Sequence, residues 1–231
     1  MPDYFLSDVH LRLDRPDRGD RLARLVDRLG PADRLTVVGD LCDFWFAARQ
    51  LRGDPNRCSG LRSLARFRDR GGAVVALGGN HDAWLGPFYE QTFGARFVAE
   101  SLDLDLGGLR AHVAHGHKVG ALTSWKAVME SRAFLAGFRR LPGPIADALG
   151  SVLESSNRSR QDAFDRRGLE AFRAFAGTFA GRADLVILGH VHKPLDTGDS
   201  RPRLVVLGGW HAASSYLVAA DGEVTHVVEP A

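Results

Sequence analysis

The sequence predicts an α/β fold in which mixed β-sheets and helices form layers. Short apolar runs rich in β-branched residues recur along the chain, and their length suits buried strands. Segments with helical periodicity lie between the early runs. The stretch from 203 to 229 consists mainly of strand-like runs. Alternating strands and helices followed by a strand-rich end are typical of a layered α/β domain.

Eight short segments are expected to be strands. Most of them end beside glycine or aspartate, residues that favour turns. The last two flank a turn expected at Asp221 and Gly222. The segments are residues 4–6, 35–38, 73–77, 113–114, 185–188, 204–207, 216–218 and 224–228.

Two helices are expected between the early strands. In segment 20–29, leucines and a valine occupy positions i, i+3, i+4 and i+7, which is the spacing of one helical face. In segment 61–67 a similar apolar pattern continues, and Gly71 and Gly72 end the helix.

The segment from about 118 to 182 differs from the rest, because helical periodicity dominates and no strand is expected. It contains 11 Lys and Arg residues against 6 Asp and Glu residues, so it is locally basic. We interpret it as a helical insertion, or lid, over the sheet ends of a single domain spanning residues 1–231. Its apolar stripes either form the insertion's own core or line an apolar binding groove. The stripes are Ile145, Leu149, Val152 and Leu153, and Phe164, Leu169, Phe172, Phe175, Ala176 and Phe179.

Composition and charge argue against several classes of protein. A chain of 231 residues is long enough for one large domain. The net charge of +2 gives no reason to expect a nucleic-acid partner. The two cysteines, Cys42 and Cys58, argue against a disulfide framework and for a reducing compartment. The sequence has no signal-peptide pattern and no run of about 18 apolar residues, so we expect a cytoplasmic protein.

Polar residues follow five of the expected strands. The carboxyl ends of strands in layered α/β folds share one rim, so the side chains of these five loops are expected to converge. Each loop supplies carboxylate, amide or imidazole groups. The loops contain Asp8 and His10; Asp40 and Asp43; Asn80, His81 and Asp82; His115 and His117; and His190 and His192.

This cluster of carboxylates and imidazoles predicts a metal site. Burial of such groups without a cation would carry a large desolvation and repulsion penalty. Mixed oxygen and nitrogen ligands suit Mn, Fe, Zn or Co better than Ca. Seven candidate ligands are too many for one tetrahedral ion and fit two ions, with Asp40 as the candidate that bridges them. Gly39, Gly79 and Gly189 would let the backbone approach closely.

Together, the five loops resemble the complete signature of the calcineurin-like metallophosphoesterases. The motifs occur in order from residue 8 to residue 192. The resemblance implies a four-layer αββα sandwich of two mixed sheets. It also implies two divalent metal ions held by two sets of ligands. One ion would take Asp8, His10, Asp40 and His192, and the other would take Asp40, Asn80, His115 and His190.

The chemistry that this resemblance implies is hydrolysis of a phosphate ester or anhydride. Two ions about 4 Å apart would activate water and neutralise the phosphoryl group. His81 would stabilise the developing charge or protonate the leaving group. Asp43 and Asp82 would orient imidazoles rather than bind metal. Structural roles are expected for the other four histidines, which are His112, His117, His211 and His226. Of these, His117 is nearest the site in the sequence.

Further motifs resemble one branch of this family, the UDP-2,3-diacylglucosamine diphosphatases of lipid A biosynthesis. They are Phe44-Trp45 after the second loop, Lys193-Pro194 after the fifth, and segment 205–211 before a late strand. The resemblance implies a Mn-dependent pyrophosphatase that releases UMP and a lipid monophosphate. It implies a helical lid that holds acyl chains. We expect a monomer that associates peripherally with the cytoplasmic face of the inner membrane.

Two residues depart from that branch and leave other functions open. His81 stands where the branch has arginine, and His117 stands where it has aspartate. One alternative is a metal-dependent phosphatase or phosphodiesterase acting on a soluble nucleotide or phosphoprotein. Another is a non-catalytic scaffold. In the insertion, three polar residues either contact the substrate or belong to a solvated helix face: Asn157, Arg158 and Arg160.

Overall fold

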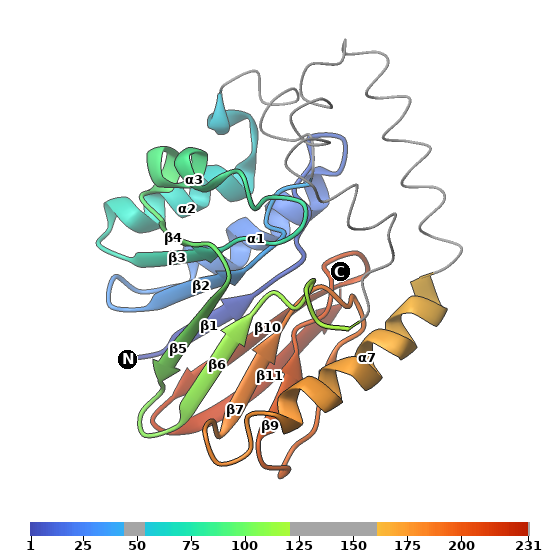
Figure 1. Ribbon diagram of the computed structural model, residues 1–231. Helices are drawn as coiled ribbons and strands as arrows, with labels where there is room; N and C mark the ends of the chain where they lie inside the picture. Colours follow the sequence, from blue (N-terminus) through green and yellow to red (C-terminus); the bar gives the residue numbers. More distant parts are fainter. Residues whose placement is uncertain (44–53, 121–160, 231) are drawn as a thin grey trace.

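The computed structural model describes residues 1–43, 54–120 and 161–230, although the side chains of 161–166 lie outside this description. Two mixed β-sheets lie between helices, which confirms the expected four-layer α/β architecture (Figure 1). The inner faces of both sheets supply one buried apolar cluster, in which Phe5 and Val38 of the first sheet meet Val113 and Ile187 of the second. Face-to-face packing of this kind buries the apolar side of each sheet.

The first sheet has six strands. Their order is β11 (Glu223–Pro230), β10 (Ala213–Ala220), β1 (Asp3–Leu6), β2 (Arg34–Val38), β3 (Ala73–Leu77) and β4 (Arg96–Val98). The strands β1 to β4 run parallel, whereas β10 and β11 form an antiparallel hairpin at one edge. Asp221 and Gly222, both with positive φ, make its turn as the sequence predicts.

The second sheet has five strands. Their order is β5 (Ser101–Asp105), β6 (Arg110–Ala114), β7 (Leu185–Leu188), β9 (Arg203–Val206) and β8 (Leu195–Asp196). The central strands β6, β7 and β9 run parallel, and the two edge strands are antiparallel to their neighbours. The sequence does not predict β4, β5 and β8. All three are edge strands with few buried residues, so they lack the continuous apolar run that marks the central strands.

Three helices cover the outer face of the first sheet: α1 (Pro16–Asp27), α2 (Ser59–Asp69) and α3 (Gly86–Phe93). A short 3-10 turn, η2 (Pro55–Arg57), precedes α2. The helix α1 begins at Pro16, before the expected start, because proline suits the first turn of a helix. Leu22 and Val26 of α1 are fully buried, as their spacing predicts.

The helix α7 (Gln161–Gly177) covers the outer face of the second sheet (Figure 1). Its Phe172 is buried against Val186, Leu204 and Val206. The described part of this phenylalanine stripe is therefore core between helix and sheet rather than the lining of a groove. Residues 121–160, with the first apolar stripe and the predicted contacts Asn157, Arg158 and Arg160, lie outside the described residues.

Among the residues that the structure describes, no helix is both long and apolar enough to cross a membrane.

Candidate metal centre

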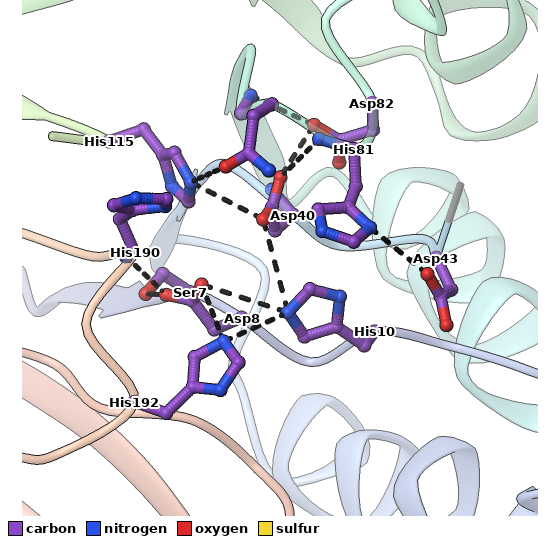
Figure 2. Close-up of polar contacts among 12 residues, drawn as sticks. Ser7, Asp8, His10, Asp40, Asp43, His81, Asp82, His115, His190 and His192 are labelled. Carbon is purple, nitrogen blue, oxygen red and sulfur yellow. Dashed lines mark hydrogen bonds and ion pairs between the residues drawn. The ribbon is translucent and has the colours of Figure 1, made fainter. Parts of the chain in front are cut away.

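The five predicted loops meet at one edge of the sandwich, beyond the carboxyl ends of β1, β2, β3, β6 and β7 (Figure 2). Backbone hydrogen bonds join neighbouring loops within each sheet, and a backbone-to-side-chain bond joins the two sheets. The amide of Asp8 donates to the Gly39 carbonyl over 3.2 Å, and the amide of Gly189 donates to the His115 carbonyl over 3.1 Å. The His190 amide donates to Asp8 Oδ2 over 2.8 Å, across the gap between the sheets. Residues distant in sequence thus form one cluster.

Several of the candidate ligands have an unfavourable backbone conformation. Asp8, His10, Asp40 and His190 have φ values of 53°, 48°, 54° and 67°. This left-handed region is unusual for residues other than glycine and costs of order 1–3 kcal/mol each. Among the described residues, Asp221 in the β10–β11 turn is the one other non-glycine residue with positive φ. Backbone strain is therefore concentrated in the strand-end loops, which is typical of functional sites.

Two of the three predicted glycines show why the loops need residues without a side chain. A Cβ at Gly189 would lie 2.5 Å from Ser7 Oγ and 2.8 Å from Asp8 Oδ2. A Cβ at Gly79 would lie 2.6 Å from the Asp40 backbone nitrogen. These separations are shorter than van der Waals contacts allow, so glycine lets the carboxylates of Asp8 and Asp40 approach the neighbouring loops, as the sequence analysis expected.

Asp8, His10 and His192 form the first group of candidate ligands. The Nε2 atoms of His10 and His192 lie 3.2 Å apart, and they lie 3.8 and 3.6 Å from Asp8 Oδ1. Asp8 Oδ1 is buried and has no hydrogen-bond partner among the residues that the structure describes. A buried carboxylate oxygen without a partner is costly, and a cation between these three atoms would satisfy it. The donor set therefore fits a divalent metal ion.

The second group contains Asp40, Asn80, His115 and His190. His115 Nδ1 donates to the Val38 carbonyl over 2.8 Å, and its Nε2 therefore faces Asn80 Oδ1 at 3.2 Å and Asp40 Oδ2 at 3.3 Å. The ring of His190 lies 5.2 Å from that of His115, and one ligand atom from each of Asp40, His115 and His190 falls within 4.8 Å of the others. These oxygens and nitrogens converge on space that a second cation fits.

Asp40 is shared by the two groups. Its Oδ2 lies 3.3 Å from His115 Nε2 and 3.9 Å from His10 Nε2, whereas its Oδ1 accepts a hydrogen bond from the His81 amide over 2.9 Å. Figure 2 shows this carboxylate between the imidazoles of both groups. A carboxylate in this position can bridge two ions, as expected for Asp40.

The side chains of the cluster shift one another's pKa values. Burial raises the pKa of Asp40, but the imidazoles of His115 and His81 outweigh burial and hold it well below its usual range. Burial lowers the pKa of His115, but Asp40 outweighs burial and raises it to about 10. Burial lowers the pKa of His10 to about 4, so its imidazole is neutral at pH 7 and carries a lone pair. Asp40 is therefore ionised and His10 is neutral at pH 7, which are the forms in which these side chains bind a metal ion.

His81 lies beside the first group, with its ring 4.7 Å from that of His10. Asp43 Oδ1 lies 3.0 Å from His81 Nδ1, and Arg12 Nη1 donates to Asp43 Oδ2 over 3.2 Å. Asp43 thus has the contact expected of a carboxylate that orients an imidazole. Burial lowers the pKa of His81, but Asp40 and the hydrogen bond to Asp43 outweigh it and raise the pKa to about 9.

Asp82 contacts backbone groups rather than an imidazole, in contrast to the sequence-based expectation. Its Oδ1 accepts from the amides of Gly79 and Asp40, and its Oδ2 accepts from the Leu41 amide and the Tyr89 hydroxyl, all over 2.7–3.1 Å. The carboxylate therefore ties the loop after β3 to the loop after β2. Tyr89, fully buried on α3, was not identified from the sequence because it sits in an apolar helical pattern.

The remaining histidines divide into two kinds. His112 pairs with Asp103 over 2.7 Å and stacks on Phe179, and His226 contacts Ser215, so both have the expected structural roles. His117 lies near the cluster, with its ring 5.4 Å from that of His115. His211 was expected to be structural, but its ring lies 4.8 Å from His192 and 5.8 Å from His10. Its position after a Gly-Gly-Trp segment gave no sign of this proximity.

Comparisons with known proteins cover all five loops of the candidate metal centre. The family model for calcineurin-like phosphoesterases matches residues 1–194. A UDP-2,3-diacylglucosamine hydrolase of Aeromonas salmonicida is 29% identical and aligns over 96% of this chain and 91% of its own. A protein of that name from Neisseria gonorrhoeae is 24% identical over 99% and 98% of the two chains. Among solved structures, an archaeal phosphodiesterase covers 99% of both chains at 14% identity, with a TM-score of 0.49.

Proposed function

The chain belongs to the calcineurin-like phosphoesterase family, whose members are metal-dependent phosphohydrolases, and from this premise we propose that it hydrolyses UDP-2,3-diacylglucosamine. The products would be UMP and a lipid monophosphate. The observation that carries the proposal is the convergence of two groups of oxygen and nitrogen ligands on a shared carboxylate, Asp40. Relatives named for this substrate align over nearly the full chain and support the choice of substrate.

Seven side chains would hold the metal ions. Asp8, His10 and His192 would bind one ion; Asn80, His115 and His190 would bind the other; and Asp40 would bind both. When bound, the two divalent cations, with Mn²⁺ as the proposed metal, would activate water and neutralise phosphoryl charge. The Val38 carbonyl fixes the His115 ring so that Nε2 faces the cluster, and the amide of His190 fixes Asp8 through Oδ2.

His81 is the proposed catalytic residue. Asp43 holds Nδ1 of the imidazole, which leaves Nε2 to donate a hydrogen bond to a phosphoryl oxygen or to the leaving oxygen. The His81 amide is also bound to Asp40 Oδ1, so the residue is attached to the bridging carboxylate through its backbone. This double attachment would keep the imidazole oriented toward the reacting phosphoryl group.

One feature of the chain favours a second candidate function. His81 stands where the diphosphatase branch that the chain resembles has arginine. Histidine at this position suits general acid catalysis, whereas arginine stays charged and binds phosphate through two parallel hydrogen bonds. The second candidate is therefore a metal-dependent phosphatase or phosphodiesterase that acts on a soluble nucleotide or phosphoprotein.

The proposed substrate is a nucleotide linked to a lipid, so it places the reaction at the cytoplasmic face of the inner membrane. We propose that the chain acts there as a monomer in peripheral contact with the bilayer. Cys42 and Cys58 are free and buried, which is consistent with a reducing compartment.

A panel of three substrates tests the proposal. Purified Mn-loaded protein would be offered UDP-2,3-diacylglucosamine in detergent, bis-p-nitrophenyl phosphate and p-nitrophenyl phosphate. We expect UMP release from the lipid substrate with a kcat/KM well above that for either aromatic ester. Turnover of the aromatic esters alone would favour the second candidate. No turnover with Mn²⁺, Fe²⁺, Zn²⁺ or Co²⁺ would support a non-catalytic scaffold.

A further inference from the structure

His211 is an exposed residue at the rim of the metal centre, on the side of the first ligand group. It lies between β9 and β10, and its ring is 4.8 Å from that of His192 and 5.8 Å from that of His10. The adjacent backbone packs directly on His192. A Cβ at Gly209 would lie 3.0 Å from His192 Cβ and 3.1 Å from His211 Nδ1. The two imidazoles are thus held next to each other by close packing.

The backbone that carries His211 is anchored on both sides. The amide of Trp210 donates to the Asp8 carbonyl over 3.1 Å, and its carbonyl accepts a hydrogen bond from the buried Arg21. The fully buried indole of Trp210 donates from Nε1 to the Ser215 carbonyl over 3.0 Å. These contacts fix His211 relative to the metal centre while its own side chain stays exposed.

Arg18, in the first turns of α1, contacts His10 of the first ligand group. Its Nη1 donates to the His10 carbonyl over 3.2 Å, and within the described part of the chain its other N–H groups have no hydrogen-bond partner. Asp17 and Asp43 are the acidic groups near enough to act on its charge. The neighbouring Arg12, by contrast, is bound to Asp14 and Asp43.

Arg18 and His211 lie beside the same candidate ligand, His10. Arg18 Nη1 donates to the His10 carbonyl over 3.2 Å, and the ring of His211 lies 5.8 Å from that of His10. The imidazole of His211 offers an N–H, and the guanidinium of Arg18 has further N–H groups without a hydrogen-bond partner among the described residues. Such a pair of donors suits a phosphate or diphosphate oxygen.

We propose that Arg18 and His211 bind the second phosphoryl group of a diphosphate substrate, next to the phosphoryl group that is attacked at the metal centre. The proposal rests on the proposed function, since it assigns a place to the phosphate that is not cleaved. It explains how the site would select a diphosphate over a monophosphate, because a monophosphate fills the metal centre and leaves these donors unused. The two residues determine specificity and take no part in bond cleavage.

The test compares two ligands that differ by one phosphoryl group. Binding of α,β-methylene-UDP, which resists hydrolysis, and of UMP would be measured by isothermal titration calorimetry on the Mn-loaded protein. We expect Arg18→Ala and His211→Ala each to weaken α,β-methylene-UDP about 10- to 100-fold, the value of a charge-assisted hydrogen bond, and to weaken UMP far less. Arg24→Ala removes an equal charge from an exposed position on the same helix and serves as the matched control.

Two further variants keep the test decisive if an alanine variant does not fold. His211→Gln keeps an N–H donor and should retain most of the preference for α,β-methylene-UDP. Arg18→Lys keeps the positive charge but lacks the planar guanidinium that can donate two parallel hydrogen bonds, so it should lose part of that preference. Metal content would be measured on every variant. In the double variant Arg18→Ala/His211→Ala, the two losses should be less than additive, because both residues bind one group.

Three outcomes would overturn the inference. They are an equal loss for both ligands, a loss no larger than that of Arg24→Ala, and a loss of metal from the Arg18 or His211 variants. The last would mean that these residues support the metal centre itself. A wild-type protein that fails to cleave UDP-2,3-diacylglucosamine would disprove the proposed function, but its preference between α,β-methylene-UDP and UMP would still report on the second phosphoryl site.

Discussion

Individual side chains in the metal centre are each oriented by a second group. The Val38 carbonyl holds Nδ1 of His115, Asp43 holds Nδ1 of His81, and the His190 amide holds Oδ2 of Asp8. The second ring nitrogen of His115 and the second oxygen of Asp8 then face the other candidate ligands. This arrangement fixes the tautomer and the ring orientation before any ligand binds, which reduces the cost of binding.

Substitution of His81 separates metal binding from catalysis. His81→Ala should keep both metal ions but slow turnover by roughly 10²- to 10⁴-fold, the usual contribution of a general acid or base. The measurement is kcat together with metal content by elemental analysis. Asp43→Asn is the matched control, since it leaves the imidazole in place but weakens its orientation, and it should slow turnover less. A metal-depleted His81→Ala protein would contradict the role assigned to His81.

The loops that follow the strands have a strained backbone and lie very close to one another. Asp8 and Asp40 have positive φ, and the glycines at 79 and 189 bring neighbouring backbone against their carboxylates. Asp82 holds the second and third loops together through three backbone amides and Tyr89. These hydrogen bonds offset the strain, because they leave the loops few alternative conformations.

The close approach at Gly189 can be tested by adding one methyl group. Gly189→Ala would place a Cβ 2.5 Å from Ser7 Oγ and 2.8 Å from Asp8 Oδ2, so the loop must move. We expect a decrease of about 1–3 kcal/mol in the free energy of unfolding, together with weaker metal binding. Urea denaturation measures the first effect and metal titration the second. Gly177→Ala, where an added Cβ meets no atom within 4 Å, is the control and should lower neither the free energy of unfolding nor the affinity for metal.

At the scale of the whole molecule, the sandwich brings the ends of two sheets to one rim. Asp8, His10, Asp40 and Asn80 follow strands of the first sheet, whereas the other candidate ligands, His115, His190 and His192, follow strands of the second. The helix α7 supports the second sheet next to the site, since Phe172 packs against Gly116, where a Cβ would lie 2.7 Å from its ring. Assembly of the metal centre therefore requires the complete fold.

Metal binding should for this reason stabilise the folded chain. The midpoint of thermal unfolding is expected to rise with the concentration of free Mn²⁺, with each tenfold increase above the dissociation constant adding about 1.4 kcal/mol per site. Removal of metal with EDTA should lower the midpoint. Differential scanning calorimetry provides the measurement. Asp40→Ala removes the carboxylate shared by both groups, so its midpoint should be independent of Mn²⁺. The same midpoint for wild-type protein with Mn²⁺ and with EDTA would argue against the site.

The sequence by itself determined the strands with continuous apolar runs, the first two helices and the residues of the five loops, because these features depend on local periodicity and on the residues next in the chain. It did not determine the edge strands β4, β5 and β8, whose few apolar residues give no clear pattern. It also did not reveal the backbone role of Asp82 or the position of His211 beside His192. These depend on contacts between distant segments, such as the one between His190 and Asp8, which are 182 residues apart. Only tertiary packing of the two sheets decides such contacts, because no local preference of the chain specifies them.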